Sequence, residues 1–432
     1  MAEYALLSMV LVLFLLIFIK VPIGFALGFS SLLYIWMKDV PLTILAQYLN
    51  TYLDSFTLLA IPLFILSGEF MNRGGVTHRL ISFANSLVGH IPGGLAHVNV
   101  GTSILMAGMS GSSSSDAATT SLVLVPQMER EGYSRAFAAA ITAASATIGP
   151  VIPPSIHVVL MGGINEISIG RLFMGGVVPG LLMGVSMMLY TIMISKKRHF
   201  PRNPRVSFTE FVTSLTRAFW PLLTPVIILG GMMVGIFTPT EAAAIAALYT
   251  LFLGTVLYRK IGWKDLLPAC LNTVKVTSNI MLIVGFAGVF GWILISEEVA
   301  LTFTQWIQSF TDNWVVVLII VNVLLLFLGC FLSTTSLIVI LSPILFPMIE
   351  KFGIDPVHFG IMMMLNLEIG QLTPPVGITS FVVMDVAKTD IKSFMREMIP
   401  FLYVLGVVLL LTTYVPQVVT FLPNLIFGAS GN

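Results

Sequence analysis

The stretch Gly108-Met-Ser-Gly-Ser-Ser-Ser-Ser-Asp116 decides the fold, because a polar run of the same kind recurs 221 residues later as Gly329-Cys-Phe-Leu-Ser-Thr-Thr-Ser336. A Gly/Pro break follows each run at the same offset: Gly149-Pro-Val-Ile-Pro-Pro-Ser155 pairs with Gly370-Gln-Leu-Thr-Pro-Pro-Val-Gly377. Between run and break, the shared positions are Pro126 with Pro347, Glu129 with Glu350, and Gly132 with Gly353. A large apolar unit that occurs twice, with Gly, Pro and hydroxyl residues inside it, is typical of secondary transporters built from internal repeats.

Composition shows which solvent surrounds the chain. Of its 432 residues, 57% are hydrophobic and only 9% are charged. That is more apolar surface than a soluble protein of this length buries, so most of it must face lipid. The sequence therefore predicts an all-α polytopic membrane protein.

The basic residues predict how the chain crosses the membrane. The loop 195–217 is the most basic segment, and the positive-inside rule places it in the cytoplasm. Counting outward from it, the topology is consistent only if the segments 93–128 and 313–349 enter and return on one side. Each has two apolar arms of about 13 to 16 residues, shorter than a full span, joined by a polar tip. We therefore predict ten spans and two re-entrant hairpins.

This topology has two further consequences. All of the 21 basic residues except Lys38, Arg171 and Lys351 fall on the cytoplasmic side, and both chain termini are external. The first hairpin enters from the cytoplasm and the second from outside, although their sequences align in the same direction. The repeats are therefore predicted to be inverted, related by a pseudo-two-fold axis in the membrane plane.

Each tip and break together predict an ion site. Proline leaves carbonyl groups without intrahelical partners, and in hydrocarbon such groups are costly unless something binds them. Free carbonyls and nearby hydroxyls are ligands for a hard cation such as Na⁺. The same breaks expose half-helix N-termini, which favour anions. We expect two cation sites, with a carboxylated substrate between the two tips.

Three carboxylates leave alternatives open. Asp116 directly follows the serine run and either caps the returning half-helix or lies near a cation. Glu368 precedes the second break, where an intramembrane carboxylate is a functional candidate. Glu241 is either such a candidate or a first-turn charge at the membrane surface.

An enzyme is a remote alternative. Gly108-Met-Ser110-Gly111 matches the Gly-x-Ser-Gly pattern of intramembrane serine proteases, with His157 as a conceivable base. In the second repeat Ser110 becomes Phe331 and His157 becomes Ile378, although the hydroxyl run is kept. A protease would gain nothing from the duplication, so we predict that the chain is not an enzyme.

At these residues the sequence resembles the large membrane subunit of tripartite ATP-independent periplasmic (TRAP) transporters. The resemblance covers nearly the whole chain and includes Val21-Pro-Ile-Gly24, Ser55-Phe-Thr-Leu-Leu-Ala-Ile-Pro62, Ser67-Gly-Glu69, the first tip and both Pro-Pro breaks. It implies an elevator-type ion-transporter fold and sodium-driven uptake of an organic acid such as a C4-dicarboxylate, a sialic acid or a sugar acid. No cofactor is expected, and Na⁺ would be the coupling ion.

The resemblance also implies residues for the sites. Sodium would be held by two sets, one in each repeat: Ser112, Ser115, Gly149, Pro150 and Ile152 in the first, and Gly329, Leu332, Thr335, Gly370, Thr373 and Val376 in the second. The substrate would contact the tips and the breaks, at Ser112, Ser113, Ser114, Ser115, Asp116, Ser155, Ser333, Thr334, Thr335, Ser336, Pro375 and Gly377.

The implied domains alternate between a scaffold and a transport unit. They are scaffold helices and an amphipathic arm over 1–54; a first transport repeat over 55–165, with its broken helix at 135–165; scaffold helices and a second arm over 166–272; a second transport repeat over 273–388, with its broken helix at 357–387; and a C-terminal helix over 389–432.

The implied partners are a small four-helix membrane subunit on a separate chain and a periplasmic solute-binding protein, and the implied location is a bacterial or archaeal inner membrane. A self-sufficient sodium/dicarboxylate symporter of the same superfamily is the alternative that stays open, since it would share the hairpins and need no partner.

Overall fold

The computed structural model describes residues 4–108 and 111–428, and the regular elements in these ranges are helical. Within them the helices are α1 Ala5–Phe18, α2 Ile23–Met37, α3 Leu42–Leu53, a 3₁₀ turn Phe56–Leu59, α4 Ala60–Arg73, α5 Val76–Val88, α6 Gly94–Met106, α7 Ser113–Arg130, α8 Arg135–Ala146, α9 Ile148–Val151, α10 Ile156–Ile164, α11 Ile169–Arg198, α12 Phe208–Met233, α13 Pro239–Phe252 with a π-helical turn Leu253–Leu257, α14 Trp263–Ser296, α15 Val299–Gln308, α16 Trp314–Gly329, α17 Thr334–Lys351, α18 Pro356–Gly370, α19 Ile378–Ala387, α20 Ile391–Tyr414 and α21 Gln417–Phe427. The all-helical class predicted from composition is confirmed.

Several of these helices are long and apolar enough to cross a membrane. Among the described residues there are six, or eight when the bent pairs α3–α4 and α8–α10 each count as one span. The sequence predicts ten spans. The difference arises because α1, α2 and the interrupted pair α18–α19 consist of pieces of 10 to 15 residues, short of the roughly 20 that a straight span needs. Helix α17, predicted as a hairpin arm, meets the length criterion with 18 residues.

The element boundaries repeat with the offset seen in the sequence. Helix α7 begins at Ser113 and ends at Arg130, and α17 begins at Thr334 and ends at Lys351, each 221 residues later. The proline pairs at the two breaks are both cis. The first arms of the hairpins have 13 and 16 residues, as expected, but both second arms have 18, longer than expected.

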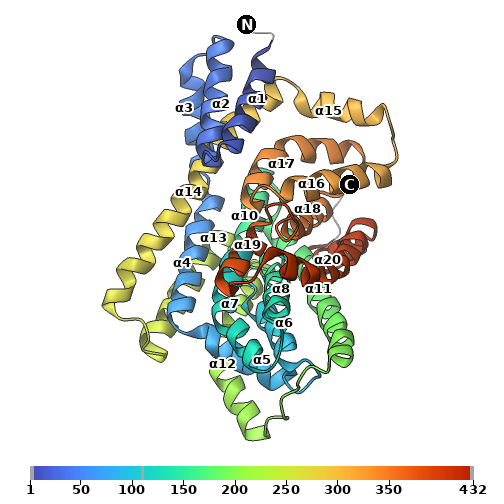
Figure 1. Cartoon of the computed structure of the whole chain (residues 1–432). Helices are drawn as coiled ribbons and strands as arrows, with labels where there is room; N and C mark the ends of the chain where they lie inside the picture. Colours follow the sequence, from blue (N-terminus) through green and yellow to red (C-terminus); the bar gives the residue numbers. More distant parts are fainter. Residues whose placement is uncertain (1–3, 109–110, 429–432) are drawn as a thin grey trace.

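The helices form two groups, visible in Figure 1. Helices α1 to α4 lie on the left with α13 and α14, where α4 packs on α13 and α2 packs on α14. The hairpins and broken helices lie in the centre and right, where α11 packs on α20 and α21 and α20 packs on α8. Helices α6 and α7 lie in the lower half of the view, and α16 and α17 in the upper half.

This packing groups some helices differently from the domain boundaries expected from the sequence. Helix α4, inside the expected first transport repeat, packs against α13 and α14, and α14, most of which lies inside the second, packs against α2, α3 and α4. Helix α11, inside an expected scaffold segment, packs against α6, α18 and α20. The expected C-terminal helix is two helices, because α20 ends at Tyr414 and α21 begins after Pro416.

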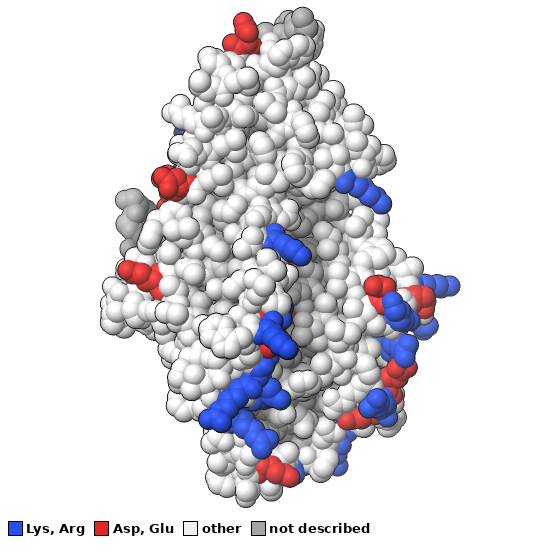
Figure 2. Space-filling model, turned by 90° about the vertical axis from the view of Figure 1, so that its left-hand side faces the viewer, with Lys and Arg blue, Asp and Glu red and all other residues white. Residues whose placement is uncertain are grey.

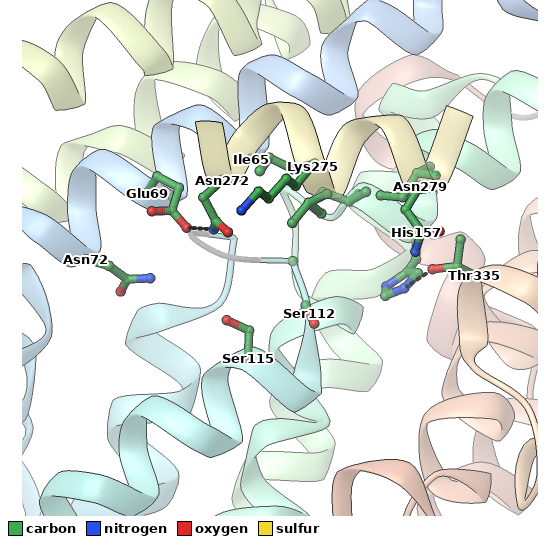
Figure 3. A pocket seen from close by; sticks show the side chains of 15 residues that line it. Ile65, Glu69, Asn72, Ser112, Ser115, His157, Asn272, Lys275, Asn279 and Thr335 are labelled. Atoms are coloured by element: carbon green, nitrogen blue, oxygen red, sulfur yellow. Dashed lines mark hydrogen bonds between the residues drawn. The ribbon is translucent and has the colours of Figure 1, made fainter. Parts of the chain in front are cut away.

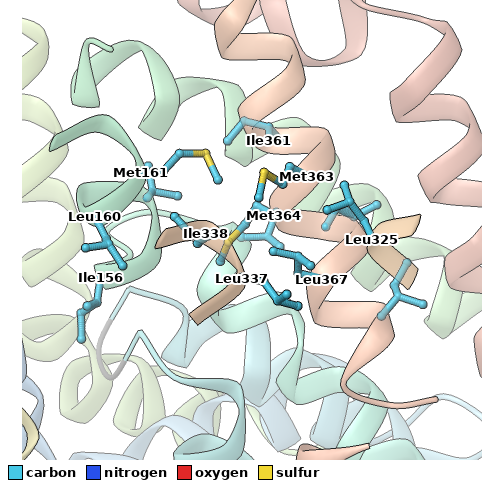
Figure 4. Close-up of a cluster of buried hydrophobic side chains, with 14 of the residues drawn as sticks. Ile156, Leu160, Met161, Leu325, Leu337, Ile338, Ile361, Met363, Met364 and Leu367 are labelled. Atoms are coloured by element: carbon cyan, nitrogen blue, oxygen red, sulfur yellow. The ribbon is translucent and has the colours of Figure 1, made fainter. Parts of the chain in front are cut away.

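An apolar core across the two repeats holds the tips in place. Helix α10 of the first repeat brings Leu160 and Met161 against α17 and α18 of the second, as Figure 4 shows. The clustered side chains of α17 and α18 include Ile338 and Met364, and all four residues are fully buried. Since lipid is as apolar as these side chains, close packing is what stabilises such contacts in a membrane.

Charged side chains are unevenly distributed over the surface. Figure 2 shows that Lys and Arg side chains gather in the lower half of the face it draws, while few lie in the upper half. The lower half is also where the chain passes from α11 to α12 through the basic loop (Figure 1). This is the asymmetry on which the sequence-based topology rests.

Candidate functional site

Both hydroxyl runs lie at the start of the second hairpin arm. Ser112 is the extended residue before α7, and Ser333 is the equivalent residue before α17. The Ser333 hydroxyl accepts a hydrogen bond from the Ser336 backbone N–H at 3.3 Å, which caps α17. The Ser112 and Ser114 hydroxyls lie 3.2 Å apart. The hydroxyls thus form the N-terminal turns of two half-helices, where free N–H groups and the helix dipole favour an anion.

Each tip contacts the break of its own repeat through glycine. A Cβ at Gly329 would lie 3.1 Å from the Gly370 Cα, and a Cβ at Gly108 would lie 2.7 Å from the Pro153 carbonyl oxygen. The Gly377 N–H also donates to the Cys330 carbonyl at 3.0 Å. Only glycine allows these backbones so close together, and Gly108 also has a φ of +80°. The pairing of tip and break predicted from their spacing is therefore present in both repeats.

Asp116 lies where the tip and the break of the first repeat meet. It is buried in the first turn of α7, and a Cβ at Gly149 would come within 2.7 Å of its Oδ2. The carboxylate therefore faces the first break directly. Of the two roles considered for Glu241, the structure shows the first-turn charge. Its Oε2 accepts hydrogen bonds from the N–H and the hydroxyl of Thr238, both at 2.8 Å, which completes a capping box at the start of α13.

A buried polar network joins the two repeats. The Oε1 of Glu368 accepts a hydrogen bond from the Thr334 hydroxyl at 3.0 Å and another from Gln371 at 3.4 Å. Gln371 also contacts Thr379, whose hydroxyl lies 3.4 Å from that of Ser113. Ser113 and Thr334 are equivalent residues of the two repeats, so the two tips meet around one carboxyl group. These hydrogen bonds fix the relative positions of the residues they join, while the Oε2 of Glu368 has no hydrogen-bond partner among the described residues.

A second contact between repeats lies at the edge of a cavity. The His157 Nε2 lies 3.0 Å from the Thr335 hydroxyl, across from the first tip. The cavity has a volume of about 520 Å³. Figure 3 shows Ser112 and Ser115 on one side and α14 on the other, with Lys275 and Asn279 on α14.

Helix α14 supplies polar groups that the motifs did not reveal, and they lie beside Glu69 of α4. Asn272, Lys275 and Asn279 are spaced by three and four residues, which places them on one face of α14. Asn272 donates to Glu69, whose carboxylate also pairs with Arg73 at 3.2 Å. No ion pair found in the described ranges involves Lys275, so its ammonium group provides positive charge beside the tips. The polar spacing within an apolar helix was the signal that could have found this face.

The predicted site residues are not all in one place. Ser112, Ser115 and Thr335 line the cavity, while Ser113, Asp116, Ser155, Thr334 and Ser336 are buried behind it. Ser114, Ser333 and Ile152 are partly exposed. Gly329 and Leu332 are buried in the second tip, and Gly149, Pro150, Gly370 and Gly377 are buried at the two breaks. Thr373 instead lines a separate, mostly apolar cavity of about 530 Å³, and Pro375 and Val376 are exposed.

The chemistry of these groups suits a hard cation and an organic anion. Within residues 4–108 and 111–428 no three His, Cys, Asp or Glu side chains come together as a transition-metal site would require. The groups present are hydroxyls, amides, carbonyls, the carboxylates of Glu69 and Asp116, the His157 imidazole and the Lys275 ammonium group. Ser110, the nucleophile of the protease alternative, lies outside the described residues, and the His157 ring contacts Thr335.

The fold is that of a solved membrane transporter. The structure is similar to the crystal structure of the YdaH transporter of Alcanivorax borkumensis, with a TM-score of 0.60 over 86% of this chain and 87% of that one, at 17% identity. This similarity shows that the two chains share a fold. The chain belongs to the DctM component family of tripartite ATP-independent periplasmic transporters, whose family model matches residues 10–418.

The names of relatives in this family refer to different organic acids. The sialic acid TRAP transporter large permease protein SiaM of Vibrio cholerae is 42% identical over 96% of this chain and 97% of its own length. The C4-dicarboxylate large permease protein DctM of Pseudomonas aeruginosa is 42% identical over 86% and 87% of the two chains. The sialic acid permease protein SiaT of Haemophilus influenzae is 39% identical over 96% of this chain and 68% of its own. These relatives are named as permeases, not enzymes, and the resemblance seen in the motifs is confirmed.

Proposed function

We propose that this chain carries a small organic acid into the cell, driven by sodium ions. The observation that supports this most directly is the cavity in which Lys275 and two asparagines of α14 face the hydroxyl tips. A cation and a set of donors on one wall, and half-helix N-termini on the other, match a carboxylate with further hydroxyl or keto groups. Sialic acid and C4-dicarboxylates, named for the relatives, are acids of this kind.

Sodium would bind where tip and break meet in each repeat. The first site would use Ser112, Ser115 and carbonyls of Gly149 to Ile152, with the Asp116 carboxylate facing the same break. The second would use Thr335, Gly329, Leu332 and Gly370. Thr373 and Val376 are weaker candidates, because Thr373 faces another cavity and Val376 is 40% exposed. Close contacts of a tip glycine with the break in each repeat, Gly108 with Pro153 and Gly329 with Gly370, support two sites.

Coupling would follow from electrostatics. A carboxylate in the cavity and a cation behind each tip attract one another, so each binds more tightly in the presence of the other, and this coupling is reciprocal. If two sodium ions accompany a monoanion, one net positive charge enters per cycle. A membrane potential of about 100 mV then contributes roughly 2.3 kcal/mol to uptake.

An elevator movement would carry the site across the membrane. The cavity lies between α14, in the group with α1 to α4 and α13, and the tips, in the group with the hairpins and broken helices. We propose that the second group moves and the first is the scaffold, with the hairpins entering from opposite sides as the topology predicts. The small membrane subunit would bind this scaffold in the inner membrane, and a periplasmic binding protein would deliver the substrate.

The role of Lys275 is tested by Lys275→Gln. In proteoliposomes with the small subunit and the binding protein, this variant should raise the KM for substrate delivered by the binding protein at least tenfold, because a hydrogen bond to a charged group contributes about 1.5 to 3 kcal/mol. The matched control is Lys264→Gln, an exposed lysine on the same helix outside the cavity. Unchanged KM in Lys275→Gln, or an equal effect in the control, would exclude this cavity as the substrate site.

A further inference from the structure

A second polar cavity of about 680 Å³ lies apart from the candidate transport site. It is formed by α5, by the start of α12 and by the segment after the π-helical turn. Its lining residues are Gly75, His78, Arg79, Ser82, Ser214, Arg217, Tyr258 and Lys260. Two arginines, a lysine and a histidine thus converge from three segments, and no acidic residue is among the lining residues.

Part of this basic cluster is held in place. The Arg79 guanidinium donates to the carbonyls of Gly74 at 3.1 Å and Gly75 at 2.8 Å, and it stacks 3.7 Å from the centre of the Tyr258 ring. The Tyr258 hydroxyl in turn donates to the Arg217 carbonyl at 3.4 Å. No ion pair among the described residues involves Arg79, Arg217 or Lys260. The cavity therefore presents a preorganised arginine and two unneutralised cations, which suits a phosphate group.

Apolar side chains continue from the basic cluster along the helices. Trp220 lies one helical turn beyond Arg217 on α12 and is 44% exposed, and Val256 and Leu257, just before Tyr258, are 56% and 43% exposed. These positions are deeper in the predicted spans than the cations. A basic pocket with exposed apolar residues beneath it fits an amphiphile better than a soluble phosphate, because acyl chains can cover the apolar surface.

The location agrees with a lipid ligand. The sequence-based topology places Arg79, Arg217 and Lys260 on the cytoplasmic side, where anionic lipids are concentrated. Figure 2 shows that Lys and Arg side chains gather in this lower half of the molecule. We propose that this cavity binds the phosphate headgroup of an anionic phospholipid, whose chains lie along α12 and the end of α13.

The proposal is tested with the full-length chain purified in detergent. Thermal unfolding is followed while phosphatidylglycerol, phosphatidylcholine or inorganic phosphate is added, and the dissociation constant is taken from the concentration dependence of Tm. We expect phosphatidylglycerol to stabilise the protein, and phosphatidylcholine and phosphate to have little effect. The double variant Arg217→Gln/Lys260→Gln should bind phosphatidylglycerol roughly 30-fold more weakly, from the usual contribution of a basic residue near an anionic lipid.

The matched control removes the same two charges elsewhere. Lys392→Gln/Arg396→Gln changes exposed residues of α20 outside the cavity and should leave phosphatidylglycerol binding unchanged. Equal weakening in the control, or equal stabilisation by phosphatidylcholine, would overturn the proposal. Equal stabilisation by inorganic phosphate would assign the cavity to a soluble anion and overturn the lipid assignment. If the double variant does not fold, the single variant Lys260→Gln, at an exposed side chain, is measured in the same titration and should still bind more weakly than the wild type.

Discussion

Gly329 and Gly370 bring the second tip and its break into close backbone contact. A Cβ at Gly370 would come within 2.8 Å of the Gly329 Cα, so Gly370→Ala must push the second tip away from its break. We expect a loss of stability of about 1 to 3 kcal/mol and weaker apparent sodium affinity. Thermal unfolding and the sodium dependence of uptake measure the two effects.

The control for this substitution is Gly406→Ala. Gly406 lies within helix α20, and a Cβ there would have no neighbour within 4 Å, so this change should be neutral or stabilise by up to about 1 kcal/mol. If Gly370→Ala behaved like Gly406→Ala, the contact between tip and break would not matter for sodium binding.

Glu368 gives a second prediction about a single side chain. Its Oε1 accepts hydrogen bonds from Thr334 and Gln371, and the residue is fully buried. Glu368→Ala leaves both donors without this acceptor and creates a cavity, so it should destabilise by about 3 kcal/mol or more. Glu368→Gln keeps an oxygen at the same place, as part of an amide, and should therefore lower the stability less than Glu368→Ala. The comparison of their unfolding midpoints is the measurement, and equal midpoints would show that the network contributes little.

The hairpins are the elements on which the topology depends. Arg130 and Lys351 are exposed, end the second arms, and are equivalent in the two repeats. In a background without Cys270 and Cys330, cysteine at position 130 should react with an impermeant maleimide from the cytoplasm, and cysteine at position 351 from outside. Inverted repeats require this result. Labelling of both positions from the same side would contradict the topology.

Local sequence patterns predicted the helical class and the tip and break motifs well. Serine and threonine before an apolar run, and Gly and Pro within one, determine local backbone geometry, so residues such as Ser333 and Gly377 can be read one segment at a time. The spacing of polar residues in α14 could mark a polar face there, but no local pattern shows that this face meets the first tip. Lys275 lies about 160 residues from the first tip and meets it only through packing of α14, and Glu368 lies at the centre of the network for the same reason.

The whole assembly gives the last prediction. The segments predicted to be external, 38–54, 165–170 and 296–312, are short, and two of them contain the helices α3 and α15. The described ranges contain no large domain outside the helical bundle that could capture a scarce solute. Reconstituted with the small membrane subunit, the chain should therefore show almost no sodium-dependent uptake until its own binding protein is added. Uptake of free substrate into proteoliposomes is the measurement, and a binding protein for another solute serves as the control. Saturable sodium-coupled uptake without any binding protein would favour the self-sufficient symporter.

The contact between His157 and Thr335 constrains how this chain can evolve. After a duplication, each copy is ordinarily free to accumulate substitutions on its own, and position 157 is histidine whereas its counterpart is Ile378. Because the imidazole of one copy is 3.0 Å from the hydroxyl of the other, neither residue can now change without a cost at its partner. We expect homologues that lack this histidine to differ at position 335 as well, so that the two halves diverge in sequence as a matched pair.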